Sequence, residues 1–255
     1  MKRKDAVLAL ALAVVTGSAM VGSLITVEPA AIAPLRSVES GVLNAASTVA
    51  HLVPSMPDPA PAEQTAWDLP NLDHPRVDHW VNMFQTERRD DFAIFLQRKE
   101  KYEPMIREKL AERDMPQDLI YLAMIESGFN PTASSWAKAK GLWQFIEPTA
   151  KRYGLTVNRS VDERTDPVKS TDAALAYLGD LYEQFDSWYL AAAAYNTGEN
   201  RVARIMRQVT GSEKGSEESY YEIAHHLPAE TRDYVPLMIA AARIAKEPAK
   251  YGFDA

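Results

Sequence analysis

Residues 125–145, IESGFNPTASSWAKAKGLWQF, join an apolar run to a segment of small polar and aromatic residues. Ser-Gly and Asn-Pro pairs commonly end helices, so the apolar run is predicted to be a helix that stops here. Its last turn holds Glu126, the only acidic residue between Asp118 and Glu147. The stretch therefore predicts a helix end that carries a single carboxyl beside a polar loop.

The helix that leads into this stretch is predicted to be deeply buried. Leu119, Leu122, Ala123 and Glu126 recur at i, i+3, i+4 and i+7, which is one helical face. Apolar surroundings and the negative end of the helix dipole both disfavour a carboxylate, so the pKa of Glu126 is predicted to be raised. A carboxyl that is protonated near neutral pH can serve as a general acid. The alternative is a structural glutamate that bonds a backbone amide or an arginine.

The composition of the chain excludes several classes of protein. Its 255 residues are 46% hydrophobic, which is enough for one sizeable core. The net charge is -7 and no basic run occurs, so no nucleic-acid partner is expected. Cysteine is absent, which excludes disulfides, thiolate nucleophiles and a lipid-bearing cysteine. His225 and His226 are adjacent and lack metalloprotease spacing, so neither a metal site nor a cofactor is expected.

The N-terminus has the pattern of an export signal. A basic start, Met1-Lys2-Arg3-Lys4, precedes an uncharged run over residues 6–27. Residues 1–27 are therefore predicted to be a signal peptide or an uncleaved signal anchor. Since basic residues precede the run, the rest of the chain is expected in the periplasm or cell envelope, with residues 6–27 as a candidate inner-membrane anchor.

The remainder divides into a linker and one helical domain. Residues 28–75 contain eight prolines, which prevent continuous helix, and are predicted to be a linker. Residues 76–255 are predicted to form one mainly α domain, with at most a short extended piece at 140–146. Pro116 is predicted to begin the helix that ends at Glu126, with Asp114 as its cap. Other helices are expected near 76–84, 92–110, 171–185, 187–195, 199–208 and 231–246, and a surface loop at 209–219.

Polar residues are set among apolar ones around the predicted helix end, as in a site that binds a polyhydroxylated ligand. The polar residues are Ser134, Ser135, Gln144 and Asn196. Trp136, Trp143, Phe145 and Tyr195 could offer flat surfaces to sugar rings. The alternative for such aromatic residues is packing in the core.

Several spaced blocks resemble one enzyme family. IESGFNP, a serine nine residues after the glutamate, AKGLWQF, TAKRYGL and AAYNTG at 193–198 resemble the catalytic domain of lytic transglycosylases of the goose-lysozyme-like superfamily. Residues 162–178 and 227–241 further resemble the membrane-bound lytic murein transglycosylase D branch. The resemblance covers about residues 76–246 and implies a lysozyme-like orthogonal helical domain. It departs from the family at Lys138, where many relatives have glycine, and LysM repeats are not expected here.

The resemblance also implies a reaction on peptidoglycan glycan strands. Such enzymes cleave the β-1,4 bond between N-acetylmuramic acid and N-acetylglucosamine and leave 1,6-anhydro ends. By this analogy Glu126 acts first as general acid and then as base on the muramyl 6-hydroxyl, which attacks C1 of its own sugar. A tethered hydroxyl at high effective concentration removes the need for the second carboxylate of ordinary glycosidases.

The resemblance assigns further residues to substrate binding by their positions in the motifs. Gln144 is expected to bind an N-acetyl sugar, and the Tyr195 hydroxyl is expected to orient the carboxyl of Glu126. Tyr234 is matched to a tyrosine near the site, with core packing on the last helix as its alternative. The full set is Ser135, Gly141, Leu142, Gln144, Tyr195, Asn196 and Tyr234.

Two other functions stay open at this point. A goose-type lysozyme would hydrolyse the same bond with an acidic helper, for which Asp162, Glu163 and Asp166 are candidates; the alternative is that these residues cap and turn the chain. A non-catalytic wall-binding protein could have kept the fold. In each case the expected partner is the glycan strand, and the domain is expected to be a monomer.

Overall fold

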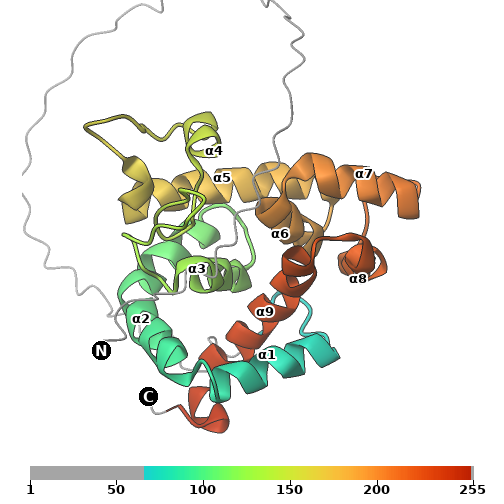
Figure 1. Ribbon diagram of the computed structural model, residues 1–255, viewed down its shortest axis with the longest axis horizontal. Coiled ribbons are helices and arrows are strands. Elements are labelled where there is room, and N and C mark those ends of the chain that lie inside the picture. The colour runs from blue at the N-terminus through green and yellow to red at the C-terminus, as the bar shows by residue number, and fades with distance from the viewer. Residues whose placement is uncertain (1–65, 254–255) are drawn as a thin grey trace, which may run out of the picture. The chain divides into compact units, whose positions relative to one another are not determined.

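Helices form the fold between residues 66 and 253, the part of the chain that the computed structural model describes (Figure 1). In chain order the elements are α1 (Pro75–Gln85), α2 (Arg89–Ala111), the 3-10 turn η2 (Gln117–Leu119), α3 (Ile120–Ser127), α4 (Glu147–Arg152), η3 (Glu163–Thr165), α5 (Pro167–Phe185), α6 (Trp188–Thr197), α7 (Glu199–Val209), α8 (Glu217–Ile223), η4 (Ala224–His226), α9 (Ala229–Lys246) and η5 (Pro248–Tyr251).

The prediction of a mainly α domain with a minor extended piece is confirmed. Within residues 66–253 no strand forms, and isolated antiparallel bridges join Ser134 to Lys140 and Lys140 to Phe145. The predicted loop at 209–219 is wrong at its end, because α8 begins at Glu217. That helix buries Tyr220 and Ile223, a pair too short to show a clear period in the sequence.

The central helix α3 is buried along its whole length. All of its residues are buried, and it packs against α2 and α9. It ends at Gly128, whose φ of 57° is the left-handed conformation that glycine adopts most easily at a helix C-terminus. Figure 1 shows α3 and α9 next to one another. The predicted end of this helix is confirmed.

The predicted cap of this helix is wrong. Asp114 lies in a turn with φ 51°, and the residue at the N-cap position of η2 is Pro116. The cap acceptor is Asp68, whose carboxylate accepts the N–H groups of Gln117 and Asp118 from a distance of about fifty residues along the chain. A helix end needs acceptors for its free N–H groups, and tertiary packing can supply them from any part of the chain.

The predictions for the N-terminus concern mostly residues that the structure does not describe. Residues 1–27 and the linker up to residue 65 lie outside the described residues. No helix among residues 66–253 combines the length and the apolar character that crossing a bilayer requires. The predicted linker boundary at 75 is too late, because Leu69 is 5% exposed and belongs to the core. The sequence before α1 is rich in proline and has no helical period, so it did not predict that Leu69 would be buried.

Candidate active site

Glu126 lies in the last turn of α3 and is 6% exposed. The pKa of its carboxyl is raised to about 8, mainly by burial and to a lesser degree by the charge of Glu230, although a hydrogen bond from Tyr234 lowers it. The predicted rise in pKa is confirmed. At neutral pH the carboxyl is therefore mostly protonated, which is the state that a general acid requires.

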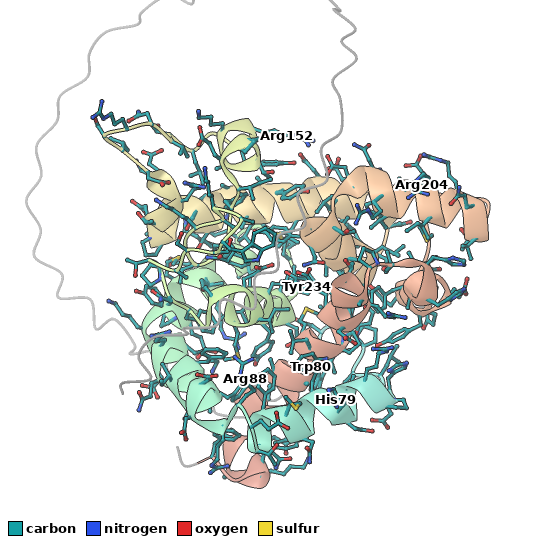
Figure 2. The ribbon with its side chains drawn as sticks, viewed as in Figure 1. His79, Trp80, Arg88, Arg152, Arg204 and Tyr234 are labelled. Carbon is teal, nitrogen blue, oxygen red and sulfur yellow. The ribbon has the colours of Figure 1, made fainter. Side chains whose placement is uncertain are left out.

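Tyr234 holds this carboxyl in place. Its hydroxyl donates a hydrogen bond to Oε1 of Glu126 at 2.5 Å, and Figure 2 shows the tyrosine in the interior of the domain. It comes from the second turn of α9 and is itself 5% exposed. Burial and the nearby carboxyl hold the pKa of Tyr234 well above its usual value, so its hydroxyl keeps its proton. Tyr234 is thus both a core residue and a hydrogen-bond donor to Glu126.

Tyr195 does not orient the carboxyl as predicted. Its hydroxyl donates to the carbonyl of Trp143 at 2.8 Å, so it fixes the loop over residues 128–146, which joins α3 to α4. The tyrosine is nevertheless close to the site, because the charge of Glu126 helps to raise the pKa of Tyr195. Family motifs place a tyrosine near the glutamate, but they do not determine which of two neighbouring hydroxyls reaches it.

Glu230 is a second carboxyl that the sequence did not identify. It lies one turn before Tyr234 on α9, and burial raises its pKa. The side-chain amide of Asn196 donates to Oε1 of Glu230 at 3.1 Å, while the oxygen of that amide accepts from the Thr231 hydroxyl at 2.8 Å. Asn196 therefore positions Glu230. The i, i+4 spacing of Glu230 and Tyr234 was a usable signal, since such residues share a helical face.

The loop over residues 128–146 is held in place by hydrogen bonds to its backbone carbonyls. The hydroxyl of Ser127 donates to the carbonyl of Leu142 at 2.8 Å, which joins α3 to the loop. Arg164, 5% exposed, donates to the carbonyls of Lys138 at 2.9 Å and Phe145 at 3.1 Å. Leu142 itself is fully buried, so its side chain packs in the core and does not face a ligand. Arg164 is a positioning residue that the sequence did not reveal.

Gly141 and Gln144 shape the same loop. Gly141 has φ 86°, and a Cβ there would lie 1.8 Å from the carbonyl oxygen of Arg164. Gln144, with φ 48°, is 7% exposed and donates its amide hydrogens to the carbonyls of Gly141 at 2.8 Å and Ala133 at 3.3 Å. Its oxygen Oε1 is buried and accepts no hydrogen bond from the described residues. Buried polar atoms are rarely left unpaired, so this oxygen is unusual among the polar groups of the loop.

The aromatic residues of the loop separate into core and surface. Trp143 and Phe145 are buried, so the prediction that they offer surfaces to sugar rings is wrong. The indole N–H of Trp143 donates instead to the hydroxyl of Thr171 at 2.9 Å. Trp136 is 77% exposed at the tip of the loop, beside Ser135, whose Oγ accepts the N–H of Ala139 at 3.1 Å. Trp136 is the loop residue whose ring is open to a ligand.

The three acidic residues that are candidates for a hydrolytic helper bind other groups of the chain. Asp162 pairs with Arg164 at 2.8 Å and with Lys140 at 3.0 Å, and these cations hold its pKa well below the usual range. Glu163 accepts the N–H of Thr156 at 2.6 Å, and Asp166 caps α5. These residues therefore cap and turn the chain. No group of three potential metal ligands occurs within residues 66–253.

Part of the chain is similar to known proteins. Residues 103–217 match the family model described as "Transglycosylase SLT domain". The chain is similar to membrane-bound lytic murein transglycosylase D of Escherichia coli (strain K12), with 40% identity over 61% of this chain and 34% of the relative. It is also similar to membrane-bound lytic murein transglycosylase F of Maricaulis maris (strain MCS10), with 32% identity over 68% of this chain and 39% of the relative.

The match to these relatives is partial in length. The chain spans about a third of the curated relatives that it matches. The crystal structure of the 70 kDa soluble lytic transglycosylase SLT70 from Escherichia coli is similar over 60% of this chain and 25% of that chain, with 24% identity and a TM-score of 0.48. Glu126 and Gln144 both fall within residues 103–217, the segment that matches the model of the transglycosylase SLT domain.

Proposed function

We propose that this chain is a peptidoglycan lytic transglycosylase. It cleaves the β-1,4 bond between N-acetylmuramic acid and N-acetylglucosamine, and Glu126 is its single general acid and base. The observation that carries this proposal is a buried carboxyl with a pKa of about 8, bonded at 2.5 Å to a tyrosine hydroxyl. The relatives named as lytic murein transglycosylases support the choice of substrate.

The proposed reaction needs no water. Protonated Glu126 gives its proton to the glycosidic oxygen as the bond from that oxygen to C1 breaks, and an oxocarbenium-like centre forms at C1. The carboxylate then takes the proton of the 6-hydroxyl of the same muramyl sugar, whose oxygen bonds to C1. The products are a 1,6-anhydro end and a free 4-hydroxyl, and Glu126 regains its proton. The Tyr234 hydroxyl favours the transient carboxylate because its hydrogen bond lowers the pKa of Glu126.

The same loop supplies the proposed sugar contacts. Gln144 Oε1, which has no hydrogen-bond partner among residues 66–253, accepts an N–H of an N-acetyl group in this proposal. Trp136 offers its exposed ring to the apolar face of a sugar. Ser135 keeps a hydroxyl hydrogen to donate, because its oxygen is the acceptor in its bond with Ala139. We further propose an exported monomer of the cell envelope that acts on glycan strands, with residues 6–27 as its anchor.

A goose-type lysozyme is the second candidate, and Glu230 is the observation that favours it. Its carboxyl is near enough to Glu126 to raise the pKa of that residue, and its own pKa is raised. Glycoside hydrolases usually use two neighbouring carboxyl groups. Against this reading, Glu230 already accepts a hydrogen bond from Asn196, and its raised pKa weakens it as a base for water.

The products of the unaltered chain separate the two candidates. Purified sacculi are digested with the 255-residue chain in water enriched in oxygen-18, and the released muropeptides are weighed by mass spectrometry. A transglycosylase gives anhydro-muramyl ends without heavy oxygen, because the nucleophile belongs to the substrate. A hydrolase gives reducing ends that carry the label. Binding to sacculi without either product would refute both candidates and leave a wall-binding protein.

Tyr234→Phe is expected to move the alkaline limb of the pH profile of kcat to higher pH. The tyrosine hydroxyl lowers the pKa of Glu126 by its hydrogen bond. Removal of this hydroxyl therefore raises that pKa above about 8, and the carboxyl stays protonated up to a higher pH. We also expect kcat to fall about tenfold, because the carboxyl loses its orienting partner. The measurement is kcat at several pH values between 6 and about 10.

Tyr195→Phe is the matched control, because the Tyr195 hydroxyl bonds the Trp143 carbonyl and not the carboxyl of Glu126. Its alkaline limb is expected to stay close to that of the unaltered chain. A Tyr234→Phe profile that overlays the Tyr195→Phe profile would show that Tyr234 serves only to fill the core.

A further inference from the structure

Residues 66–73, which we call the strap, cross the folded domain before α1 begins. The strap is bound to two helices that carry residues of the candidate site. Tyr189 of α6 donates its hydroxyl to the carbonyl of Pro70. Arg243 of α9 donates to the side-chain oxygen of Asn71 at 2.7 Å and to the carbonyl of Leu72 at 3.2 Å. The strap is thus an integral part of the domain.

The strap and the start of α3 cap one another. The carboxylate of Asp68 accepts the N–H groups of Gln117 and Asp118, the latter at 3.0 Å. In return, Oδ2 of Asp118 accepts the N–H groups of Asp68 at 3.1 Å and Leu69 at 3.3 Å. Each carboxylate satisfies two backbone donors of the other segment, which fixes the position of the strap on η2, the turn that leads into α3.

Asp118 also joins the start of α3 to the end of α9. Its Oδ1 lies 2.5 Å from Nζ of Lys246, and the two side chains are 3% and 4% exposed. The strap closes over this buried ion pair: Lys246 donates to the carbonyl of Ala66, and its Nζ lies 4.7 Å from the ring centroid of Trp67. The strap therefore supplies the hydrogen bonds and the aromatic face that a buried pair of charges needs.

The ion pair and the candidate active site lie at opposite ends of the same two helices. Glu126 follows Asp118 by eight residues, about 12 Å of helix, and Tyr234 precedes Lys246 by twelve residues, about 18 Å. Helices α3 and α9 pack against one another between these points. They are thus tied twice, by the Asp118–Lys246 pair at one end and by the Tyr234–Glu126 hydrogen bond at the other.

We propose that the strap is a positioning element of the candidate active site. By holding the Asp118–Lys246 ion pair in place, it fixes the position of α3 relative to α9. The carboxyl of Glu126 therefore stays buried away from water and bonded to the Tyr234 hydroxyl. Loosening the strap lets the far ends of both helices shift, and water then reaches Glu126. This inference rests on the proposed function for its kinetic consequence, although its effect on the pKa of Glu126 is independent of activity.

The test compares Asp68→Ala with Asp172→Ala in the 255-residue chain. Asp172 ties α5 to α2 through Lys109 at 2.7 Å and Arg113 at 2.8 Å, so its loss removes a link between two helices that do not carry Glu126. The main readout is the pKa of Glu126, followed by NMR of carbon-13-labelled glutamate carboxyls. The charged or titratable groups that face Glu126 are Tyr234, Glu230 and Tyr195, and none of the three is altered.

In Asp68→Ala we expect the pKa of Glu126 to fall by at least about one unit, because burial is the main cause that raises it. On soluble glycan strands we expect kcat to fall about tenfold with KM changed less than about twofold. Asp172→Ala is expected to leave both quantities unchanged. Asp68→Asn keeps one acceptor for the backbone donors, so we expect a smaller fall in both the pKa of Glu126 and kcat. Should Asp68→Ala not fold, Asp68→Asn is the test variant, and its pKa of Glu126 is still expected to lie below that of the unaltered chain.

The outcomes separate the strap from the proposed function. An equal pKa of Glu126 in Asp68→Ala, Asp172→Ala and the unaltered chain overturns the positioning role. A fall in the pKa of Glu126 that occurs only in the Asp68 variants supports that role, even where the unaltered chain cleaves no peptidoglycan. In that last case the proposed function fails while the strap inference stands.

Discussion

Glu126→Gln is expected to lower the rate of peptidoglycan cleavage by at least about a thousandfold, since it removes the only proton donor that the proposed mechanism uses. A glutamine keeps the size of the side chain and can still accept the hydrogen bond of Tyr234, so the loop and the helix end should stay in place. KM should therefore change little. The measurement is the release of anhydro-muropeptides by the variant and by the unaltered chain at equal concentration.

The same substitution is expected to stabilise the protein relative to the unaltered chain, by an amount that grows as the pH rises. The pKa of Glu126 is about 8 in the folded chain against an ordinary value of 4.5, so the folded state holds a proton that the unfolded state releases between these pH values. The stability that this group contributes is complete below about pH 4.5 and is lost as the pH rises to 8. The loss is at most about 5 kcal/mol, and the neutral glutamine avoids it.

Glu147→Gln is the matched control for both effects. Glu147 is the next acidic residue along the chain, it is half-exposed, and it pairs with Lys151 at 2.7 Å. Its replacement should leave the rate and the pH dependence of the unfolding free energy almost unchanged. We expect Glu126→Gln to gain about 3 kcal/mol at pH 8 relative to pH 5, measured by chemical denaturation at both pH values. A gain that is equal at the two values would contradict a buried carboxyl with a raised pKa.

Gly141→Ala is expected to destabilise the domain by about 4 kcal/mol. The glycine has φ 86°, which disfavours any side chain, and a Cβ would meet the carbonyl oxygen of Arg164 at 1.8 Å. A backbone oxygen cannot move aside as the end of a flexible side chain can. The loop must therefore shift as a whole, and with it Gln144, whose amide bonds the carbonyl of Gly141 at 2.8 Å.

Gly154→Ala separates the two causes of this loss. Gly154 has nearly the same φ, 84°, but a Cβ there would meet no atom within 4 Å. Its replacement should cost only the backbone strain, about 1 kcal/mol. Both variants are compared with the unaltered chain by chemical denaturation, and the cleavage rate is measured where each is fully folded. Equal losses of stability in the two variants would show that the contact with Arg164 does not constrain the loop.

Local sequence predicted the features that neighbouring residues determine. The apolar period identified the buried helix with Glu126 on its face, and Ser-Gly marked where it ends. The raised pKa of Glu126 followed from the same pattern, because a carboxyl in line with core residues loses its water. The turn formed by Asp162 to Asp166 also followed from local capping chemistry.

Features that depend on distant parts of the chain were missed or misplaced. The period of a helix shows which face is buried, but not which side chain of another helix meets it. Tyr195 was expected to bond Glu126, yet the hydroxyl that does so belongs to Tyr234, 108 residues away from the glutamate. Glu230 was missed for the same reason.

The sequence by itself determined a mainly α domain and the place of Glu126 at a helix end. Glu126 is the single acidic residue between Asp118 and Glu147 in the sequence. In the folded chain it has a second carboxyl nearby, because α9 brings Glu230 close to it. The tertiary structure decided this neighbour, the tyrosine that holds the carboxyl, and the strap that joins α3 to α9. Each is a contact between residues far apart in sequence, which forms only when the whole core packs and which no local pattern records.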